Sequence, residues 1–179
     1  VEVPNTIPTV VRASPFMQLY PIMGPAGERW VPLHGILPFS RVDAFHAQLN
    51  GIHEKYAARM EALRIHAAAM FTTIGTTGFL YEPVFYWQDA RHLYHNRYLS
   101  QEFLKELPSY PDNPEGRALV EEMRVAIRGA FADCGAVHLQ VGKSYPYMEG
   151  RDTRNAEMLR SLKGVLDPRG LMNPGSLGL

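Results

Sequence analysis

The sequence predicts an α+β fold in which an antiparallel sheet carries helices packed mainly on one face. Short apolar segments bounded by glycine and proline, typical of strands, occur along the chain singly or as a pair. Between them lie longer segments with apolar residues every three or four positions, as in amphipathic helices. The predicted order is strand, helix, strand pair, two helices, strand and helix. This order favours an antiparallel sheet over a parallel, doubly wound one.

Composition narrows the function classes. The chain has 179 residues, with 18 basic and 18 acidic side chains and no formal net charge. Without a basic excess, we expect neither nucleic-acid binding nor electrostatic attachment to a membrane surface. The longest nearly apolar segment, residues 67–81, is interrupted by threonine and glycine, so no membrane span is expected. Cys134 is the only cysteine, which excludes an internal disulfide and indicates a reducing compartment, taken here as the cytoplasm.

The first part of the chain is expected to be an extended connector. Residues 1–28 contain five prolines, and proline blocks helix interiors and removes hydrogen bonds from strands. At most a short strand or a turn of helix is expected there, with residues 9–12 as the candidate edge strand. The start at Val1 within such a segment suggests a piece of a longer polypeptide. We therefore divide the chain into a connector over 1–28 and a domain over 29–179.

The next elements are read from periodicity and from capping residues. Residues 29–39 predict a strand, and Ser40 predicts the N-cap of an amphipathic helix that ends near Met60. Residues 67–74 and 79–87 predict a pair of strands joined by a glycine-containing turn.

The rest of the domain is predicted to be mostly helical. One helix is expected over residues 90–107. Asn113 followed by a proline predicts the start of another helix, which should end near Gly135. Apolar and polar side chains alternate along residues 136–141, and this pattern predicts a strand. Thr153 predicts the N-cap of a last helix, which ends before a Pro/Gly-rich tail.

Common catalytic motifs are absent from the sequence. It contains no glycine-rich nucleotide loop, no zinc-protease helix and no nucleophile elbow. His92 and His95 are three residues apart, but no carboxylate completes a ligand pattern, so no metal is expected. His34 and His138 each lie in a predicted apolar strand, where a histidine is either a hydrogen-bonded core group or a polar group in a pocket. On such a strand, Gln140 shares a face with His138.

Two further features have a ligand-site interpretation beside the commoner one of simple packing. The first is an aromatic set with one acid, which is either core or the wall of a cavity for a flat ligand: Tyr81, Glu82, Phe85, Tyr86, Trp87, Tyr145 and Tyr147. Thr72 lies on the adjoining strand. The second is the tail, where Pro174 and Gly175 rigidify a loop that presents the amide of Asn173. The alternative for the tail is a simple helix end.

Residues 162–175 (LKGVLDPRGLMNPG) resemble the C-terminal signature of FAD-linked oxidases of the vanillyl-alcohol oxidase and para-cresol methylhydroxylase type. The resemblance covers residues 29–179 and extends more loosely over the opening segment. It implies a ferredoxin-like cap domain whose sheet covers the isoalloxazine ring of FAD and forms the substrate pocket. It also implies an N-terminal FAD-binding domain in the same protein, which holds most of the cofactor.

The resemblance assigns roles to individual residues. The whole enzyme would transfer a hydride from an alcohol, hydroxy-acid or phenolic/benzylic substrate to flavin. His138 and Tyr81 are the candidate catalytic residues. The other candidates are substrate-binding (Gln140, Tyr145, Thr72 and Glu82) or cofactor-binding (Asn173, Gly175 and Ser176).

The sequence also departs from the family pattern. Ser176 stands where phenol oxidases carry a basic residue, and His138–Leu139 replaces a Tyr–Arg pair, so no phenolate-binding arginine is expected there. Gly27 is nearest to the position where one relative attaches its flavin, so we expect no covalent link. The alternative function is a non-catalytic α+β module that binds a ligand or a partner, because these residues hold no self-contained catalytic set. A small-molecule substrate is expected, and a homo-oligomer is left open.

Overall fold

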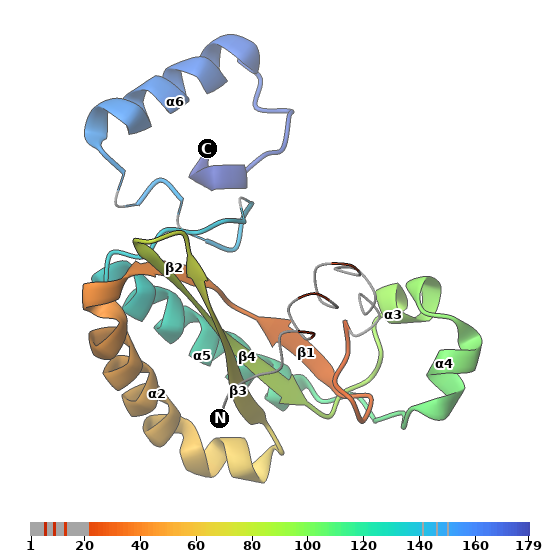
Figure 1. The fold of residues 1–179 in the computed structure, drawn as a ribbon. Coiled ribbons are helices and arrows are strands. Elements are labelled where there is room, and N and C mark those ends of the chain that lie inside the picture. Colours follow the sequence, from red (N-terminus) through yellow and green to blue (C-terminus); the bar gives the residue numbers. More distant parts are fainter. Residues whose placement is uncertain are drawn as a thin grey trace.

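A computed structural model describes residues 22–140, 142–145, 147–149 and 151–179, together with Thr6, Thr9 and Ala13. It contains a four-stranded antiparallel sheet with helices around it (Figure 1). The α+β prediction is therefore confirmed. Most of the edge strand expected at residues 9–12 lies outside the described residues, and Thr9 itself is helical rather than extended.

Strand β4 (Gly78–Trp87) is the centre of the sheet. Strand β3 (His66–Ile74) pairs with one edge of β4, which confirms the predicted strand pair. On the other edge, β1 (Arg29–Pro32) and β2 (Gly35–Pro38) follow one another in a single register.

A proline explains the gap between β1 and β2. The carbonyl of Pro83 accepts a hydrogen bond from Leu33 N–H at 2.8 Å, but Pro83 has no N–H to return. The ladder therefore loses one bond without losing its register. The strand predicted over residues 29–39 is two short strands that pair with β4 in one continuous register.

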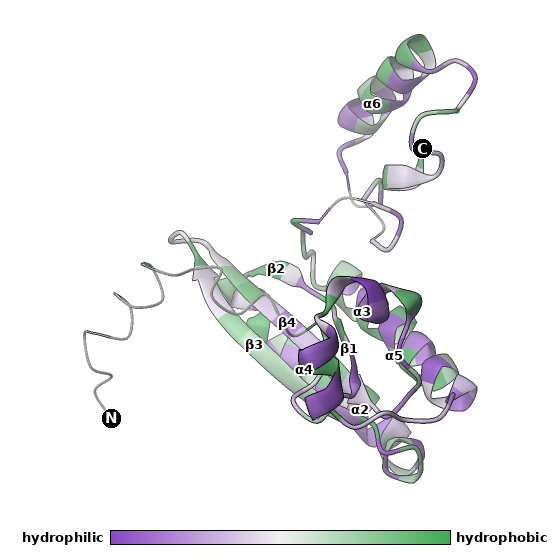
Figure 2. Cartoon of the chain, turned by 90° about the vertical axis from the view of Figure 1, so that its right-hand side faces the viewer, coloured by the Kyte–Doolittle hydropathy of each residue, from purple (hydrophilic) through white to green (hydrophobic). Residues whose placement is uncertain are grey.

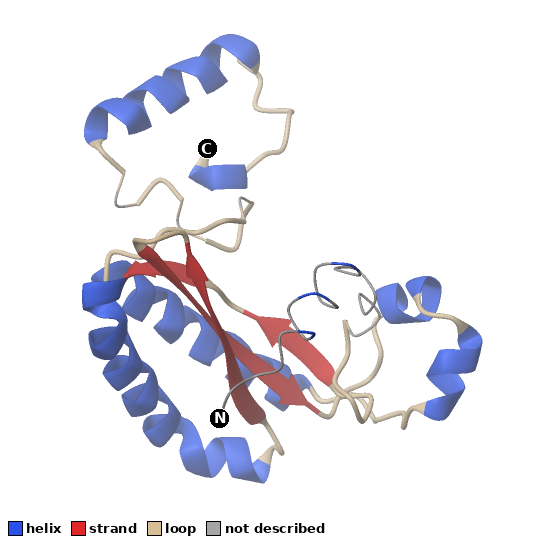
Figure 3. Cartoon of the chain, in the orientation of Figure 1, coloured by secondary structure: helices blue, strands red, loops and turns tan. Residues whose placement is uncertain are grey.

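Helices α2 (Val42–Ala62) and α5 (Pro114–Asp133) cover one face of this sheet (Figures 1 and 3). Phe45 of α2 stacks on Phe131 of α5 with ring centroids 4.1 Å apart, and both are fully buried. Gly35 of β2 is needed beneath them, because a Cβ there would lie 2.5 Å from the Phe131 ring. No described helix packs on the centre of the opposite face, so the predicted one-sided packing is confirmed.

Two helix predictions need correction. The helix expected over residues 90–107 is two short ones, α3 (Leu93–Tyr98) and α4 (Gln101–Glu106). Leu99 between them is extended and buried, and Ser100 Oγ accepts the Phe103 N–H at 3.2 Å to start α4. Ser40 is no N-cap, because a 3₁₀ turn, η1 (Phe39–Arg41), leads directly into α2.

The ends of the later helices follow capping chemistry. Asn113 Oδ1 accepts the Gly116 N–H at 2.8 Å to begin α5, and Gly135 follows the helix with φ 70°, both as predicted. Helix α6 (Thr153–Leu166) is capped by Asp152 rather than by Thr153, with Oδ1 3.0 Å from Arg154 N. A short 3₁₀ turn, η2 (Ser176–Gly178), ends the chain. Within the described ranges, no helix is long and apolar enough to cross a membrane.

The strand predicted over residues 136–141 is wrong at residues 138–140, and Val141 lies outside the described residues. Val137 pairs with Ile36 through two hydrogen bonds, at 2.8 and 3.0 Å. The next main-chain N–H groups, of Leu139 and Gln140, donate instead to the side chain of His34. Because an imidazole takes the donors that a ladder would use, the strand ends where the candidate site begins.

Candidate functional site

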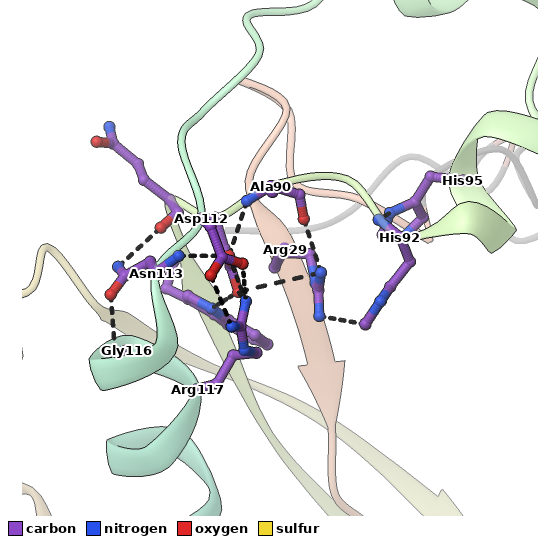
Figure 4. Close-up of polar contacts among 11 residues, drawn as sticks. Arg29, Ala90, His92, His95, Asp112, Asn113, Gly116 and Arg117 are labelled. Atoms are coloured by element: carbon purple, nitrogen blue, oxygen red, sulfur yellow. Dashed lines mark hydrogen bonds and ion pairs between the residues drawn. The ribbon is translucent and has the colours of Figure 1, made fainter.

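The described residues include two polar clusters, each with a buried centre, and the first surrounds Asp89. The Asp89 carboxylate is fully buried and accepts hydrogen bonds from Trp87 Nε1, Ala90 N–H and Asn113 N–H, at 3.1, 2.7 and 2.9 Å (Figure 4). Arg117 of α5 adds an ion pair at 2.8 Å. These contacts join the end of β4 to the start of α5.

Arg29 extends this first cluster toward α3. Its guanidinium lies 4.0 Å from Asp89, donates to the Ala90 carbonyl at 2.7 Å and contacts the ring of His92 (Figure 4). His95 Nδ1 accepts the His92 main-chain N–H at 3.1 Å. In the described part of the chain, no three histidine, cysteine or acidic side chains group as metal ligands.

The second cluster comprises His34, His138 and Tyr145 and lies beside the gap between β1 and β2. The Tyr145 hydroxyl is 3.0 Å from His34 N and 3.1 Å from His34 Nδ1. His138 Nδ1 donates to the His34 carbonyl at 2.7 Å, and its ring stacks on Tyr145 with centroids 4.3 Å apart. The structure therefore brings two predicted site residues, His138 and Tyr145, into direct contact.

Burial determines the charge state of this cluster. Burial lowers the pKa of His34, and the nearby His138 lowers it further. Burial also lowers the pKa of His138, against a smaller opposing effect of its hydrogen bond to His34. For Tyr145, burial raises the pKa of the phenol. At neutral pH both rings are uncharged and the phenol keeps its proton.

From the sequence, His34 could be either a core group or a pocket group, and it was not included among the predicted site residues. The structure makes it the centre of the cluster, because its main-chain and ring atoms contact both His138 and Tyr145. His34 is 104 residues from His138, so no local motif could have joined them. Its position in an apolar strand was the one available signal.

The sheet separates two other predicted residues. Tyr81 and Glu82 are neighbours in β4 and therefore point to opposite faces. Tyr81 is buried on the face covered by helices, with its hydroxyl 2.7 Å from His46 Nδ1. Thr72 of β3 pairs with Leu80, so Thr72 and Glu82 share the open face. Tyr81 therefore cannot line one wall with Glu82 and Thr72.

Glu82 is a half-buried acid on the open face of the sheet. The register places it opposite His34, and its charge raises the pKa of Tyr145. Burial raises the pKa of the half-buried Glu82 carboxyl itself. Its side chain has no hydrogen-bond or ion-pair partner among the residues that the structure describes. Gln140 joins the site through its main-chain N–H, 3.3 Å from His34 Nε2.

The tail after α6 is organised by Asp167. Its carboxylate accepts the N–H groups of Leu171 and Met172, each at 2.9 Å, and Lys163 Nζ at 2.6 Å. The hydrogen bond from Lys163 is the main cause that lowers the Asp167 pKa. Asn173, which follows, has φ 47°. The conformation of the predicted tail loop thus depends on one carboxylate and one lysine.

This tail returns to the loop that carries Tyr145. Leu177 N–H donates to the Gly142 carbonyl at 2.7 Å. A cavity of about 410 Å³ lies between α5, this loop and the tail, and both Tyr145 and Gly175 line it. The adjacent cavity of about 180 Å³ has His138 in its wall. Predicted substrate-binding and cofactor-binding residues are therefore close in space.

The tail has polar groups that suit a contact with the polar edge of a cofactor. The side chains of Asn173 and Ser176 form no hydrogen bond with other described residues, and Gly175 adopts φ 76°. These residues offer one amide, one hydroxyl and a stretch of exposed backbone. In the described ranges they form one side of a site rather than an enclosed pocket.

Residues 141–177 match the family model described as FAD linked oxidases, C-terminal domain. The matched segment contains the loop with Tyr145, helix α6 and the tail. The match supports an FAD-linked oxidase, and therefore an oxidoreductase that uses FAD together with an N-terminal FAD-binding domain. No curated protein matches the chain.

Proposed function

We propose that this chain is the substrate-facing C-terminal part of an FAD-dependent oxidoreductase. The observation that carries the proposal is the family match over residues 141–177, the segment that closes the cavity shared by Tyr145 and Gly175. The chemistry that FAD would supply when bound is acceptance of a hydride from the substrate carbon. The chain's own residues then have to orient that carbon and accept the proton that leaves the substrate.

His138 is suited to the proton-accepting role. Its Nδ1 donates to the His34 carbonyl, so the neutral ring carries a free lone pair at Nε2. Tyr145 and the main chain of Gln140 hold the surrounding groups in place. Glu82 and Thr72 would form the wall on the open face of the sheet. A direct catalytic role for Tyr81 remains a prediction, because its hydroxyl is bonded to His46 beneath α2.

We place the contact with the FAD-binding domain at the tail and at α6. Asn173, Gly175 and Ser176 are the proposed cofactor contacts. Helix α6, partly coloured as hydrophobic in Figure 2, carries apolar side chains that are exposed in the structure. Contiguous exposed apolar groups are typical of interaction surfaces. They are Met158, Leu162, Val165 and Leu166, followed by Leu171 and Met172 of the tail.

Within the family, the proposed relatives are the vanillyl-alcohol oxidase and para-cresol methylhydroxylase type. The substrate would be an alcohol, a hydroxy acid or a phenolic/benzylic compound. His34, His138 and Tyr145 are themselves neutral, whereas Arg151 lines the cavity of His138, and Arg128 and Lys143 line the cavity of Tyr145.

Purification of the full-length polypeptide tests the proposed function. We expect a yellow protein with flavin absorbance that bleaches when a suitable alcohol is added without oxygen. Replacement of Asn173 and Ser176 by alanine should lower the flavin content relative to an Asp112→Ala control, which changes an exposed acid in another region. A colourless protein that binds no added FAD would contradict the proposal and favour the non-catalytic module.

A further inference from the structure

One ammonium group closes the loop that follows α6. Lys163, in the last turn of this helix, donates to the Asp167 carboxylate at 2.6 Å and also to the Met172 carbonyl. The carboxylate and the carbonyl are both acceptors, so they would repel each other without a shared donor. The Lys163 ammonium therefore joins the two ends of the loop over residues 167–172.

The segment after this loop has a strained backbone. Asn173 and Leu177 adopt φ 47° and 63°, in the left-handed region. Asparagine adopts this region more readily than most residues, whereas a residue as large as leucine rarely does. Such conformations persist where the surrounding structure imposes them, and they cluster at ligand contacts and active sites. The strain in residues 173–177 therefore needs an external restraint.

The structure supplies such a restraint at each end of the segment. At the first end, Lys163 holds the carbonyl of Met172, the residue directly before Asn173. At the other end, Leu177 N–H donates to the Gly142 carbonyl at 2.7 Å. Residues 173–177 are thus held between α6 and the loop that carries Tyr145. Two strained residues at these ends enclose the polar groups assigned to the cofactor.

We propose that Lys163 is a positioning residue that holds residues 173–177 in the conformation required for contact with the flavin. The inference rests on the proposed function, which assigns Asn173, Gly175 and Ser176 to the cofactor. Lys163 acts through the Met172 carbonyl, because its ammonium is already bonded to Met172 and Asp167. The apparent affinity for FAD then depends on the fraction of molecules in which this loop is closed.

A simpler role for Lys163 is to place a positive charge at the end of a helix. A cation in the last turn stabilises a helix through its dipole, whatever else it contacts. Lys105 occupies the same position in α4 and is exposed. Replacement of Lys105 therefore removes a helix-end charge without opening the loop after α6. Lys105→Met is the matched control for Lys163→Met.

Tryptic cleavage of the full-length polypeptide without FAD tests the restraint directly. Arg169 is exposed within the loop, so cleavage of the bond after it reports how often the loop opens. Lys163→Met should raise this cleavage rate roughly tenfold, the effect of a lost hydrogen bond to a charged group. Lys163→Arg should restore most of the protection, because a guanidinium can donate to both acceptors.

The site of cleavage separates loop opening from general unfolding. In Lys163→Met, faster cleavage should be confined to the bond after Arg169, and Lys105→Met should cleave as the wild type does. Unchanged cleavage in Lys163→Met would overturn the proposal. Faster cleavage at all sites would also overturn it, because Lys163 would then support the fold as a whole.

Titration with FAD tests the connection to the cofactor. Lys163→Met should raise the apparent Kd for FAD roughly tenfold, and Lys163→Arg should remain near the wild type. In a protein that already carries Asn173→Ala and Ser176→Ala, the effect of Lys163→Met on the Kd should be clearly smaller, because the positioned side chains are gone. An equal effect in both backgrounds would show that Lys163 does not act through them.

The two measurements distinguish this inference from the proposed function. A wild-type protein that binds no FAD would contradict the proposed function, and with it the role of Lys163 toward the flavin, whereas cleavage would still show whether Lys163 closes the loop. A Lys163→Met variant that cleaves faster yet binds FAD as tightly as the wild type would overturn the positioning role alone. The proposed function would then stand.

Discussion

The two polar clusters each have a buried centre beside the same sheet, Asp89 in one and His34 in the other, yet they differ in how many hydrogen-bonding groups are left without a partner. Around Asp89, four donors from β4, the following loop and α5 converge on one carboxylate, so nothing is left for a ligand. Around His34, one phenol hydrogen and one imidazole lone pair remain free. Burial of polar groups is thus a sign of function only where the internal partners do not fill every position.

The largest expected effect is on turnover, from His138→Asn in the full-length enzyme. Asparagine keeps a donor toward the His34 carbonyl but removes the Nε2 acceptor. Loss of a positioned base lowers kcat by about 10² to 10⁴-fold. Steady-state kinetics measures this, and a matched His66→Asn variant on the exposed edge strand should retain its activity. An unchanged kcat for His138→Asn would mean that the cluster around His34 is no more functional than the cluster around Asp89, whose hydrogen-bonding positions are all filled (the filled cluster).

The next effect is on stability, from Asp89→Ala in the filled cluster. The substitution leaves buried Arg29 without its acidic ion-pair partner and the Trp87 Nε1–H without its acceptor. Removal of one member of a buried ion pair costs about 3–5 kcal/mol of unfolding free energy. Urea denaturation measures the loss, and Asp112→Ala, which removes only the exposed partner of Arg117, should cost far less. Equal losses from the two variants would show that Asp89 is not the centre of the cluster.

Sequence patterns correctly predicted the elements that depend on residues close together in the chain. The Asn113 cap, the glycine after α5 and the strand pair around the turn at Gly75 all follow from residues close in sequence. The errors occur where distant residues compete for the same groups. The strand at residues 136–141 ends because His34 takes its N–H groups, and the helix at residues 90–107 breaks where Leu99 is buried.

The candidate site was predictable in part for the same reason. His138 and Tyr145 were identified by their residue type, and the structure brings them together. The tail signature led to Asn173 and Gly175 because its proline and glycine are local features. The separation of Tyr81 from Glu82 follows from strand periodicity alone, yet which face stays open depends on how α2 and α5 pack.

A smaller effect on folding stability is expected when the pH is lowered. Burial lowers the pKa of His34 and His138, and it does the same for His53, His92 and His95. Their unfolded value is 6.5, so below that pH the unfolded chain binds more protons. Stability is therefore complete above pH 6.5 and falls as the pH drops toward the lower folded values. Denaturant midpoints at about pH 7.5 and about pH 5.5 measure this change.

The pH effect also sharpens the comparison of the two clusters. His138→Asn removes one titrating group and should make stability less dependent on pH in this range. A wild-type midpoint that rises as the pH falls would contradict the neutral state of the His34 cluster.

The smallest effect is expected from Asn113→Ala, at the edge of the filled cluster. The side chain caps α5 through Gly116 N–H at 2.8 Å and donates to the Gln88 carbonyl at 2.9 Å. Loss of an asparagine cap costs about 0.5–2 kcal/mol. Because the main-chain N–H of residue 113 still donates to Asp89, the carboxylate keeps its partners, and kcat of the folded enzyme should not change. A fall in kcat comparable to that of His138→Asn would mean that the two clusters are coupled, since only a shift of α5 could carry the effect to Tyr145.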